Sequence, residues 1–447
     1  MKKSRIIALA VALVITLTSV LSLSSCLSAL VHMLDTLPDT DINQPINPDS
    51  SENETDGSDD SSGGSSGSGA IDTDRETEFL PGSENNGALV DKVGASYRTL
   101  LSTVIIHTAF EVYDGSFNGY GYDETTSIHT SAGSGVIYSI DREAGDAYII
   151  TNFHVVYDED SVTSDGICDD IQLYLYGQEY SSYAIEAEYV GGSMNYDIAV
   201  LRVEDSEVLR NSLAVAASFA DSDKVAVMDE CFVVGNPEGE GMSVTSGTVS
   251  VDSETLEMLG ADYRTTISLR VMRVCAAVNH GNSGGGLYDS DGGLIGIIVA
   301  KKTGEDVDNI GYAIPGNLAK NLVENIIDNC DGITSKSLKR VLLGITLTAY
   351  TTGLTVDEES GKVIKSELVE IIELSDTCIF KDVLRVGDII TSVTVDGVTR
   401  SVSRTHHVID HMMTAREGSS ITITVERDGI EVSETMTVPV SSVTTVK

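Results

Sequence analysis

His154, Asp197 and Ser283 are residues whose types could carry out acyl transfer, and they occur in that order along the chain. Ser283 lies in the stretch HGNSGGGL, whose glycine and asparagine content indicates a tight turn. On its own, this stretch is more typical of an ordinary turn than of a reactive centre. A serine hydroxyl becomes a useful nucleophile when a general base lies beside it and a third group orients that base. The interpretation of Ser283 therefore depends on the other two residues.

His154 closely follows the apolar run AYIIT (147–151), which is typical of a buried strand. Imidazole is the side chain best suited to move a proton near neutral pH, so a histidine at the end of such a strand is a candidate general base. The alternative is an ordinary histidine that packs in the core.

Asp197 stands at the head of the run DIAVLRV, whose apolar residues predict another buried strand. A carboxylate at the edge of such a strand is costly unless it is paired. The N–H of an imidazole is a suitable partner, and this pairing fixes the tautomer in which a histidine accepts a proton. The alternative is an aspartate that faces solvent where the strand begins.

The glycines around Ser283 suit an oxyanion site. The backbone N–H of a nucleophile, with that of the residue two positions earlier, can bind the negative charge that develops on a carbonyl oxygen. Gly281 occupies the earlier position and lets a substrate approach closely. The order His, Asp, Ser inside a β-rich region is that of the chymotrypsin arrangement, not that of subtilisin or the α/β-hydrolases.

The elements that must position these residues are short strands. From about Leu89 the chain has runs rich in Val, Ile and Tyr that are separated by Gly, Asp and Asn, which predicts a mainly β sandwich or barrel. Helical periodicity is found mainly in residues 317–329. After a polar connector at 331–339, a second and smaller β-rich unit begins near Arg340, with one helix expected around 407–415.

The first 87 residues predict export and tethering. Residues 1–26 have a basic start, an apolar run and the ending LSSC, as in a bacterial lipoprotein signal whose Cys26 becomes lipid-modified. An ordinary signal or a membrane anchor is the alternative. Residues 27–87 are acidic and rich in Ser and Gly, which predicts a disordered tether. We therefore expect an extracytoplasmic protein that is lipid-anchored to the cell membrane.

Composition excludes several classes of function. The formal net charge of -41 argues against binding to nucleic acid, whose phosphates require Lys and Arg. The cysteines show no CxxC spacing, so neither a disulfide framework nor a zinc site is expected. Cys231 and Cys275 lie in apolar surroundings and are expected to be small buried hydrophobic residues.

Several motifs together resemble the HtrA/Deg-type serine proteases, which are trypsin-like double β-barrels followed by PDZ domains. TNFHVV, YDIAVLRV and HGNSGGGL correspond to the segments of that family around its catalytic histidine, aspartate and serine. The accessory segments GSGVI, VVGNPEG, SGTVS and GYAIP match as well. The resemblance implies a chymotrypsin-like double-barrel protease domain at 88–330 and a PDZ domain at 336–440.

The resemblance implies roles for named residues. Ser283 would be the nucleophile, His154 the general base, and Asp197 its orienting acid, with Gly281 and Ser283 forming the oxyanion hole. Ala277 would be the uncharged floor of the specificity pocket, which favours small or medium aliphatic side chains over Arg and Lys. No metal or organic cofactor is expected, and no nucleotide-binding motif is present, so the protease should not depend on ATP.

Two departures from the family pattern lie close to the nucleophile. Gly286 replaces a proline that usually follows GNSGG, which loosens the turn without removing a catalytic group. A Thr-Asp pair before the nucleophile is replaced by Val274 and Cys275, so the regulation of this protein is less securely predicted than its chemistry.

In the second unit, RVLLGITL resembles the loop of PDZ domains that binds a C-terminal carboxylate, with Leu343, Gly344 and Ile345 in the loop positions. A small β domain used only for packing is the alternative. His406, His407 and His411 are expected to be ordinary positions on and around the helix of this unit, with a metal patch as the alternative.

The function that these features predict is quality control and stress response in the cell envelope. The partners would be unfolded or misfolded proteins with apolar C-termini, and the resemblance implies a homotrimer. A non-enzymatic chaperone or PDZ adaptor, or a processing protease dedicated to one substrate, is the alternative. The presence of all three of His154, Asp197 and Ser283 favours the enzyme.

Overall fold

The structure is a computed structural model that describes residues 94, 97–114, 125–179, 181–301, 310–358 and 361–446. The predicted signal at 1–26, Cys26 itself and the predicted tether at 27–87 therefore lie outside the described residues. Within the described part of the chain, no helix is long and apolar enough to cross a membrane.

The first half of the region at 88–330, for which a protease domain is predicted, is a seven-stranded antiparallel sheet in the order β5-β4-β1-β2-β3-β7-β6. Alternate side chains of a strand point to the same side of the sheet. Apolar residues on these strands therefore gather on one side, where they form a core that is almost completely buried. The strands are β1 (Thr103–Asp114), β2 (Thr125–Asp141), β3 (Asp146–Thr151), β4 (Asp170–Leu175), β5 (Ile185–Glu186), β6 (Glu188–Ser193) and β7 (Ile198–Val203).

The second half is a closed barrel of six strands in the order β10-β13-β12-β11-β8-β9. Closure leaves no free edge among these strands and gives the barrel its own buried core. The strands are β8 (Glu230–Gly235), β9 (Ser243–Leu259), β10 (Thr266–Val274), β11 (Gly286–Asp289), β12 (Leu294–Lys301) and β13 (Gly311–Pro315).

Short helical segments connect these strands and place loops between the two halves. They are η1 (Phe153–Val155), η2 (Ser181–Tyr183), α3 (Glu207–Arg210), η3 (Ser222–Lys224) and η4 (Pro237–Gly239). The segments η1 and η4 matter most here, because they begin just after β3 and β8, where the candidate catalytic residues gather.

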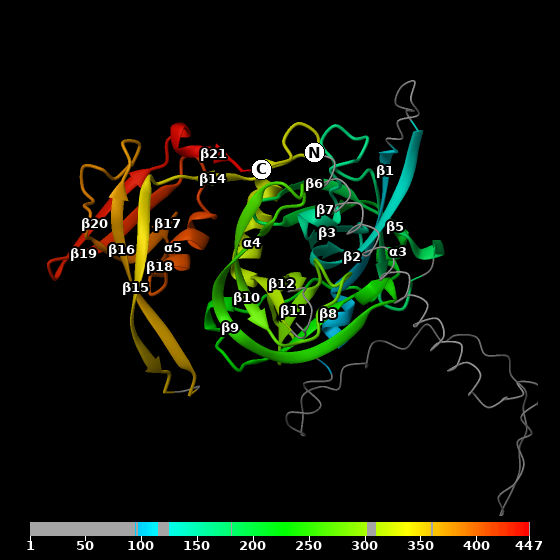
Figure 1. The fold of residues 1–447 in the computed structure, drawn as a ribbon, viewed down its shortest axis with the longest axis horizontal. Coiled ribbons are helices and arrows are strands. Elements are labelled where there is room, and N and C mark those ends of the chain that lie inside the picture. The colour runs from blue at the N-terminus through cyan, green and yellow to red at the C-terminus, as the bar shows by residue number, and fades with distance from the viewer. Residues whose placement is uncertain are drawn as a thin grey trace, which may run out of the picture. The chain divides into compact units, whose positions relative to one another are not determined.

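Helix α4 (Gly316–Asn329) follows β13 and confirms the helix predicted for this region. Its apolar face, which includes Leu318 and Leu322, is buried against β12 and β7 (Figure 1). The same helix carries Asn321 and Asn325, whose amides donate to backbone carbonyls of Asp410 and Met413 at 2.9 and 3.2 Å. The helix therefore packs on the protease strands with one face and contacts the C-terminal domain with another.

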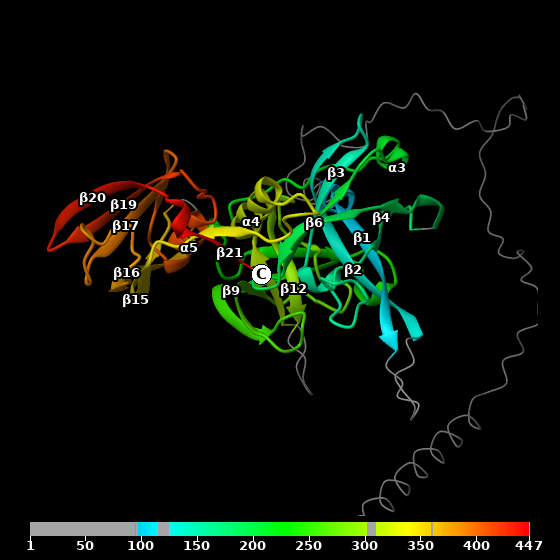
Figure 2. The same ribbon diagram turned by 90° about the horizontal axis from the view of Figure 1, so that it is seen from above.

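The C-terminal domain is a second β structure, with a sheet in the order β15-β16-β17-β19-β20 and β18 paired to β17. Helix α5 lies beside β17 and β18 (Figure 1), and the β14–β21 ribbon runs between this domain and α4 (Figure 2). The elements are β14 (Lys339–Val341), β15 (Ile345–Val356), β16 (Val363–Leu374), β17 (Ile389–Val395), β18 (Val398–Ser401), α5 (Thr405–Met412), β19 (Ser420–Arg427), β20 (Ile430–Thr437), η5 (Val440–Ser442) and β21 (Val443–Thr445).

The prediction of a mainly β protein is confirmed. The helix expected around 407–415 is present but begins at Thr405 and ends at Met412. The first two residues of the helix were missed because Thr405 and His406 are not apolar. The predicted end was too late because Met413 and Ala415 are buried apolar residues, although they lie in tight turns after the helix.

Candidate active site

His154 lies in η1, directly after the buried strand β3. Its ring Nδ1 lies 2.8 Å from Asp197 Oδ2, and its backbone N–H donates to Asp197 Oδ1 at 3.0 Å. The ring is one third exposed, with 34% of the side chain accessible to solvent. A histidine that is held on one nitrogen and partly open to solvent is a candidate general base.

Asp197 is buried, with only 3% of the residue exposed, and it has a φ of 48° in the turn before β7. The side-chain amide of Asn152 donates to the carbonyl of Asp197 at 2.9 Å, which helps to hold this uncommon backbone conformation. Both carboxylate oxygens accept hydrogen bonds from His154. The cost of burying this charge is thus offset by pairing, as the sequence predicted for a carboxylate in this position.

The environment raises the pKa of His154 above its ordinary value of 6.5. Burial lowers this pKa, but the charge of Asp197 and the hydrogen bond to it raise the pKa by more. The protonated imidazole that forms when a base takes a proton is therefore stabilised at this position.

Ser283 lies in a turn that approaches the end of β3. The ideal Cβ of a residue at Gly133, on β2, would lie 2.6 Å from a side-chain carbon of Val155 and 3.4 Å from the Ser283 carbonyl oxygen. The turn therefore places Ser283 next to η1, which contains His154. Its hydroxyl donates to the Val299 carbonyl at 3.5 Å, and no hydrogen bond joins it to His154 among the described residues. Such catalytic hydrogen bonds are often long or unformed until substrate binds.

The amides of Gly281 and Ser283 donate to no protein atom in the part of the chain that the structure describes. The N–H of Glu238 donates to the His280 carbonyl at 2.7 Å, which fixes the peptide bond that joins His280 to Gly281. Because that peptide is planar and trans, the Gly281 N–H points away from Glu238. Gly281 has a φ of 89°, and a Cβ there would lie 2.1 Å from the Asn236 carbonyl oxygen, so glycine is required.

Ser134 is a functional residue that the sequence reasoning missed. It is fully buried, and its N–H donates to the Ser283 carbonyl at 2.8 Å while its carbonyl accepts from the Thr151 hydroxyl at 2.8 Å. Its own hydroxyl donates to the Gly281 carbonyl at 2.7 Å and accepts from the Asn236 N–H at 2.9 Å. Ser134 thus ties together the end of β3, the nucleophile turn and the loop after β8. The available signal was the small polar residue between two glycines in the motif GSGVI.

Gly286, which departs from the family pattern, has a structural explanation in Tyr288. A Cβ at Gly286 would lie 2.2 Å from the Tyr288 ring, which is completely buried two residues further along β11. The Tyr288 hydroxyl is 3.1 Å from the hydroxyls of both Ser102 and Thr103. The aromatic ring fills the space that a larger residue at 286 would need.

Gly286→Ala is expected to lower the free energy of unfolding by about 1–3 kcal/mol, because the added methyl overpacks a ring that is held in place by two hydrogen bonds. Urea unfolding monitored by circular dichroism measures the effect. Gly353→Ala on β15 is the matched control, since nothing lies within 4 Å of a Cβ there. A Gly286→Ala variant as stable as the control would contradict the packing explanation.

Cys275 corrects an expectation, because it is exposed and not a buried hydrophobic residue. Side chains alternate after β10, so Val274 and Ala276 are buried while Cys275 points outward. The hydroxyl and the N–H of Thr248, at 3.4 and 3.2 Å from its sulfur, lower the pKa of the Cys275 thiol. Cys231 is buried as expected, and all five described cysteines are free thiols.

The remaining predicted positions are Ala277, the loop residues Leu343, Gly344 and Ile345, and Cys26. Ala277 is exposed, and its carbonyl accepts from the Thr245 hydroxyl at 2.8 Å. Gly344 has a φ of 74° in the loop before β15, between Leu343 and Ile345. A Cβ at Gly344 would lie 2.5 Å from the Ser375 hydroxyl. Cys26 is not among the described residues.

Comparisons with known proteins agree with this geometry. The family described as a trypsin-like peptidase domain matches residues 133–297, a segment that contains all three candidate catalytic residues. The chain is 30% identical over 310 residues to the serine protease Do-like HtrA of Lactococcus lactis subsp. cremoris (strain MG1363), and this covers 67% of the chain and 69% of that protein.

Two further relatives are matched over a smaller share of their own length. The serine protease Do-like HtrA of Bacillus subtilis (strain 168) is 34% identical over 213 residues, which cover 47% of this chain and 42% of the relative. The periplasmic serine endoprotease DegP of Escherichia coli (strain K12) is 30% identical over 316 residues, which cover 69% of this chain and 57% of the relative.

The fold and the matched domain define a trypsin-like serine protease. Within that class, the chain belongs to the HtrA family of serine endopeptidases.

Proposed function

We propose that the protein is an ATP-independent serine endopeptidase that degrades misfolded or unfolded proteins outside the cytoplasm. The observation that carries this proposal is the paired His154 and Asp197 at 2.8 Å beside a turn whose Gly281 and Ser283 amides have no protein acceptor among the described residues. A base and two aligned N–H groups are what acyl transfer to a serine requires.

In the proposed reaction, His154 takes the proton of the Ser283 hydroxyl as the serine oxygen attacks the substrate carbonyl carbon. The Gly281 and Ser283 amides donate to the oxyanion of the tetrahedral intermediate. His154 then gives the proton to the leaving amine, and a water molecule, activated in the same way, releases the acyl group from the serine. Asp197 stays ionised throughout and stabilises the imidazolium. The step that precedes all of these is rotation of the Ser283 hydroxyl from the Val299 carbonyl towards His154.

Cleavage is proposed to follow small or medium aliphatic residues. Ala277 is uncharged and its neighbours Ala276 and Val278 are apolar and buried, so a substrate Arg or Lys side chain would find no carboxylate at this position.

The cellular location is proposed from the sequence and from names of relatives. The LSSC ending before Cys26 supports lipid attachment, and the E. coli relative is named as a periplasmic enzyme. Cys26→Ala is expected to abolish incorporation of a radiolabelled fatty acid in bacterial cells, because no other residue offers a thiol at the end of the apolar run. Mass spectrometry that finds a free N-terminus elsewhere in the labelled-cell sample would contradict lipidation.

The C-terminal domain is proposed to be a PDZ domain that captures C-termini. Strand β15 is the edge strand of its sheet, which leaves room for a peptide to add as a further strand. The amides of Leu343 and Gly344 donate to no protein atom among the described residues, and the loop conformation requires a glycine at 344. Free amides in such a loop suit a terminal carboxylate.

Peptides with an apolar C-terminal residue are accordingly expected to bind the full-length protein, and amidation of their carboxylate should weaken binding at least about tenfold, because an amide loses the charge that the loop amides recognise. Fluorescence anisotropy with matched free-acid and amide peptides measures the difference. Equal affinities for the two peptides would exclude carboxylate capture.

Digestion of unfolded casein by the purified protein, compared with a native folded protein of similar size, tests the proposed function. Rapid loss of casein with the folded protein left intact supports a quality-control protease. Binding of casein without cleavage would support the adaptor or chaperone alternative instead. A homotrimer, which family membership suggests, is tested by light scattering on the same preparation.

A further inference from the structure

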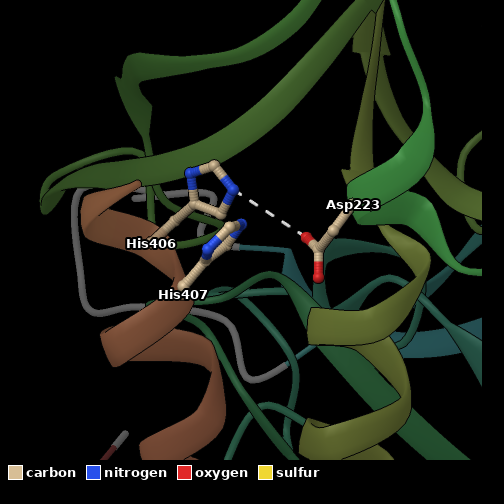
Figure 3. A group of neighbouring side chains, drawn as sticks. All are labelled: Asp223, His406 and His407. Atoms are coloured by element: carbon tan, nitrogen blue, oxygen red, sulfur yellow. Dashed lines mark ion pairs between the residues drawn. The ribbon is translucent and has the colours of Figure 1, made fainter. Parts of the chain in front are cut away.

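Three side chains that can bind metal ions come together where the protease domain contacts the C-terminal domain (Figure 3). Asp223 lies in η3, and His406 and His407 lie in the first turn of α5. One ligand atom from each lies within 4.8 Å of the other two. In the described part of the chain this is the one group of three or more His, Cys, Asp or Glu side chains with such spacing.

The two oxygens of the Asp223 carboxylate differ in their hydrogen bonds. Its Oδ2 accepts from the Asn317 amide at 2.8 Å and pairs with the guanidinium of Arg400. Its Oδ1 is buried and accepts no hydrogen bond from the described residues, although the side chain is only 8% exposed. His406 Nε2 lies 3.8 Å from this oxygen, which is too far for a hydrogen bond. Figure 3 marks this contact between the His406 ring and the Asp223 carboxylate with a dashed line.

Both histidines are largely buried at the start of α5, with arginines nearby. Burial, with the nearby charges of Arg400 and Arg270, lowers the pKa of His407 to about 4. Burial first, and then Arg270, lowers the pKa of His406 even further. The two rings meet edge to face with centroids 4.7 Å apart.

We propose that Asp223, His406 and His407 bind a zinc-like transition-metal ion that links helix α5 to the protease domain. Bonds of about 2.0–2.2 Å in a tetrahedral site place ligand atoms roughly 3.3–3.5 Å apart, so the observed 3.8 Å needs only small side-chain rotations. Two imidazoles and one carboxylate favour zinc or cobalt over magnesium and calcium, which prefer oxygen ligands. A water molecule would complete the coordination.

Neighbouring arginines limit the affinity of this site. Arg270 lies 3.6 Å from Asp223 Oδ1, but it also pairs with the buried Asp410. Arg404 pairs with Asp252 at 2.7 Å. Arg270 and Arg404 therefore each have a carboxylate partner besides the proposed ligands, whereas the partner of Arg400 is Asp223 itself, and this pairing competes with the metal ion. His407 Nδ1 accepts from the Ser403 N–H at 3.3 Å, and the ring also has a hydrogen bond with the Ser401 backbone. Metal binding by His407 therefore competes with these contacts.

Metal binding would stabilise the contact between the two domains, because the ligands come from both sides of it. A ligand that binds only the docked arrangement shifts the equilibrium towards docking. The site lies outside the proposed catalytic machinery, so the inference does not depend on the proposed reaction.

The test uses the full-length protein in a Ser283→Ala background, which prevents self-cleavage. After treatment with a chelator, the protein is titrated with Zn²⁺ by calorimetry and with Co²⁺ by visible absorption. We expect one equivalent to bind, with a cobalt spectrum of nitrogen and oxygen ligands and a melting temperature that rises with Zn²⁺. The double variant His406→Gln and His407→Gln should lose at least about tenfold in affinity, and so should Asp223→Asn, whose amide oxygen can still accept from Arg400.

Two controls separate this site from adventitious binding. His129→Gln removes an exposed histidine, and Cys275→Ser removes the exposed thiol; neither should change the affinity. Loss of binding in Cys275→Ser, or unchanged affinity in both ligand variants, would overturn the proposal. Circular dichroism of each variant before titration ensures that a loss of binding is not a loss of fold, and Asp223→Asn serves if the double variant does not fold.

Discussion

Ser283→Ala is expected to lower the rate of casein cleavage by about 10⁴- to 10⁶-fold while the fold and substrate binding are retained. The methyl group of alanine fits where the serine side chain lies, since the hydroxyl makes a single long hydrogen bond to the Val299 carbonyl. What is lost is the atom that attacks the substrate. The residual rate would come from substrate binding and from the two backbone amides of the oxyanion site, which the substitution leaves in place.

The measurement is turnover of a fluorescent casein, with thermal unfolding as the check of fold. Ser268→Ala on β10 is the matched control, because that serine is exposed on the barrel and lies in none of the loops around His154. Cleavage by the Ser283→Ala variant within about tenfold of the unchanged protein would mean that Ser283 is not the nucleophile. Casein binding with no cleavage by either protein would instead favour the adaptor.

The features that the sequence predicted well depend on residues within one continuous segment of the chain. The apolar run before His154 and the one after Asp197 each predicted a buried strand, and strands β3 and β7 are found there as neighbours in the sheet. Because the two strands pair, a histidine just after one and an aspartate just before the other meet at the same edge. Helix α4 was predictable for the same reason, since its periodicity lies within a single segment of 14 residues.

The features that were missed depend on contacts between distant segments. Ser134 bonds to the Gly281 carbonyl across 147 positions of sequence, and no local pattern encodes that contact. The prediction that Cys275 is buried was wrong because it relied on its apolar neighbours. Side chains alternate along this extended segment, so Cys275 points outward while Val274 and Ala276 are buried. Asp223 lies in a polar loop with no motif, and only tertiary structure brings it to the histidines of α5.

The conformation of the nucleophile connects this structural description with the chemistry. The Gly281 carbonyl accepts from the Ser134 hydroxyl at 2.7 Å, and the Asn236 carbonyl leaves no room for a side chain at 281, so the backbone of the proposed oxyanion site is held in place before substrate arrives. The Ser283 hydroxyl alone is out of place, and a single side-chain rotation is a small change compared with rebuilding the turn. The proposed mechanism therefore requires the Ser283 hydroxyl to leave the Val299 carbonyl, to which it donates at 3.5 Å.

Asp197→Asn is expected to lower turnover by about 10⁴-fold, even though the two side chains have nearly the same shape. The backbone N–H of His154 is a fixed donor to Oδ1 at 3.0 Å, so the amide oxygen of an asparagine must take that position. Its NH₂ group then faces the ring nitrogen Nδ1, where Oδ2 now lies at 2.8 Å. Two donors cannot share one contact, so the ring must carry its proton on Nε2, the nitrogen that should accept the proton of Ser283.

The pH dependence of the same variant provides a second readout, which a loss of stability alone would not produce. In the unchanged protein the pKa of His154 is raised above 6.5, so activity should fall as the pH drops through a midpoint above 6.5, where the base becomes protonated. In Asp197→Asn the charge that raises this pKa is gone while the burial that lowers it remains. The midpoint of the residual activity should therefore move to lower pH.

Turnover of a short chromogenic peptide, measured between about pH 5 and pH 9 in roughly unit steps, checks both the rate and the midpoint. Glu188→Gln is the matched control, because it also replaces a carboxylate by an amide. The Glu188 side chain is 74% exposed on β6 and pairs with Arg202, not with His154. That control should leave rate and midpoint unchanged. Neutralising an electrostatic partner of His154 must change the pKa of the histidine. If the rate of Asp197→Asn falls while the midpoint stays in place, Asp197 only supports the fold of the turn.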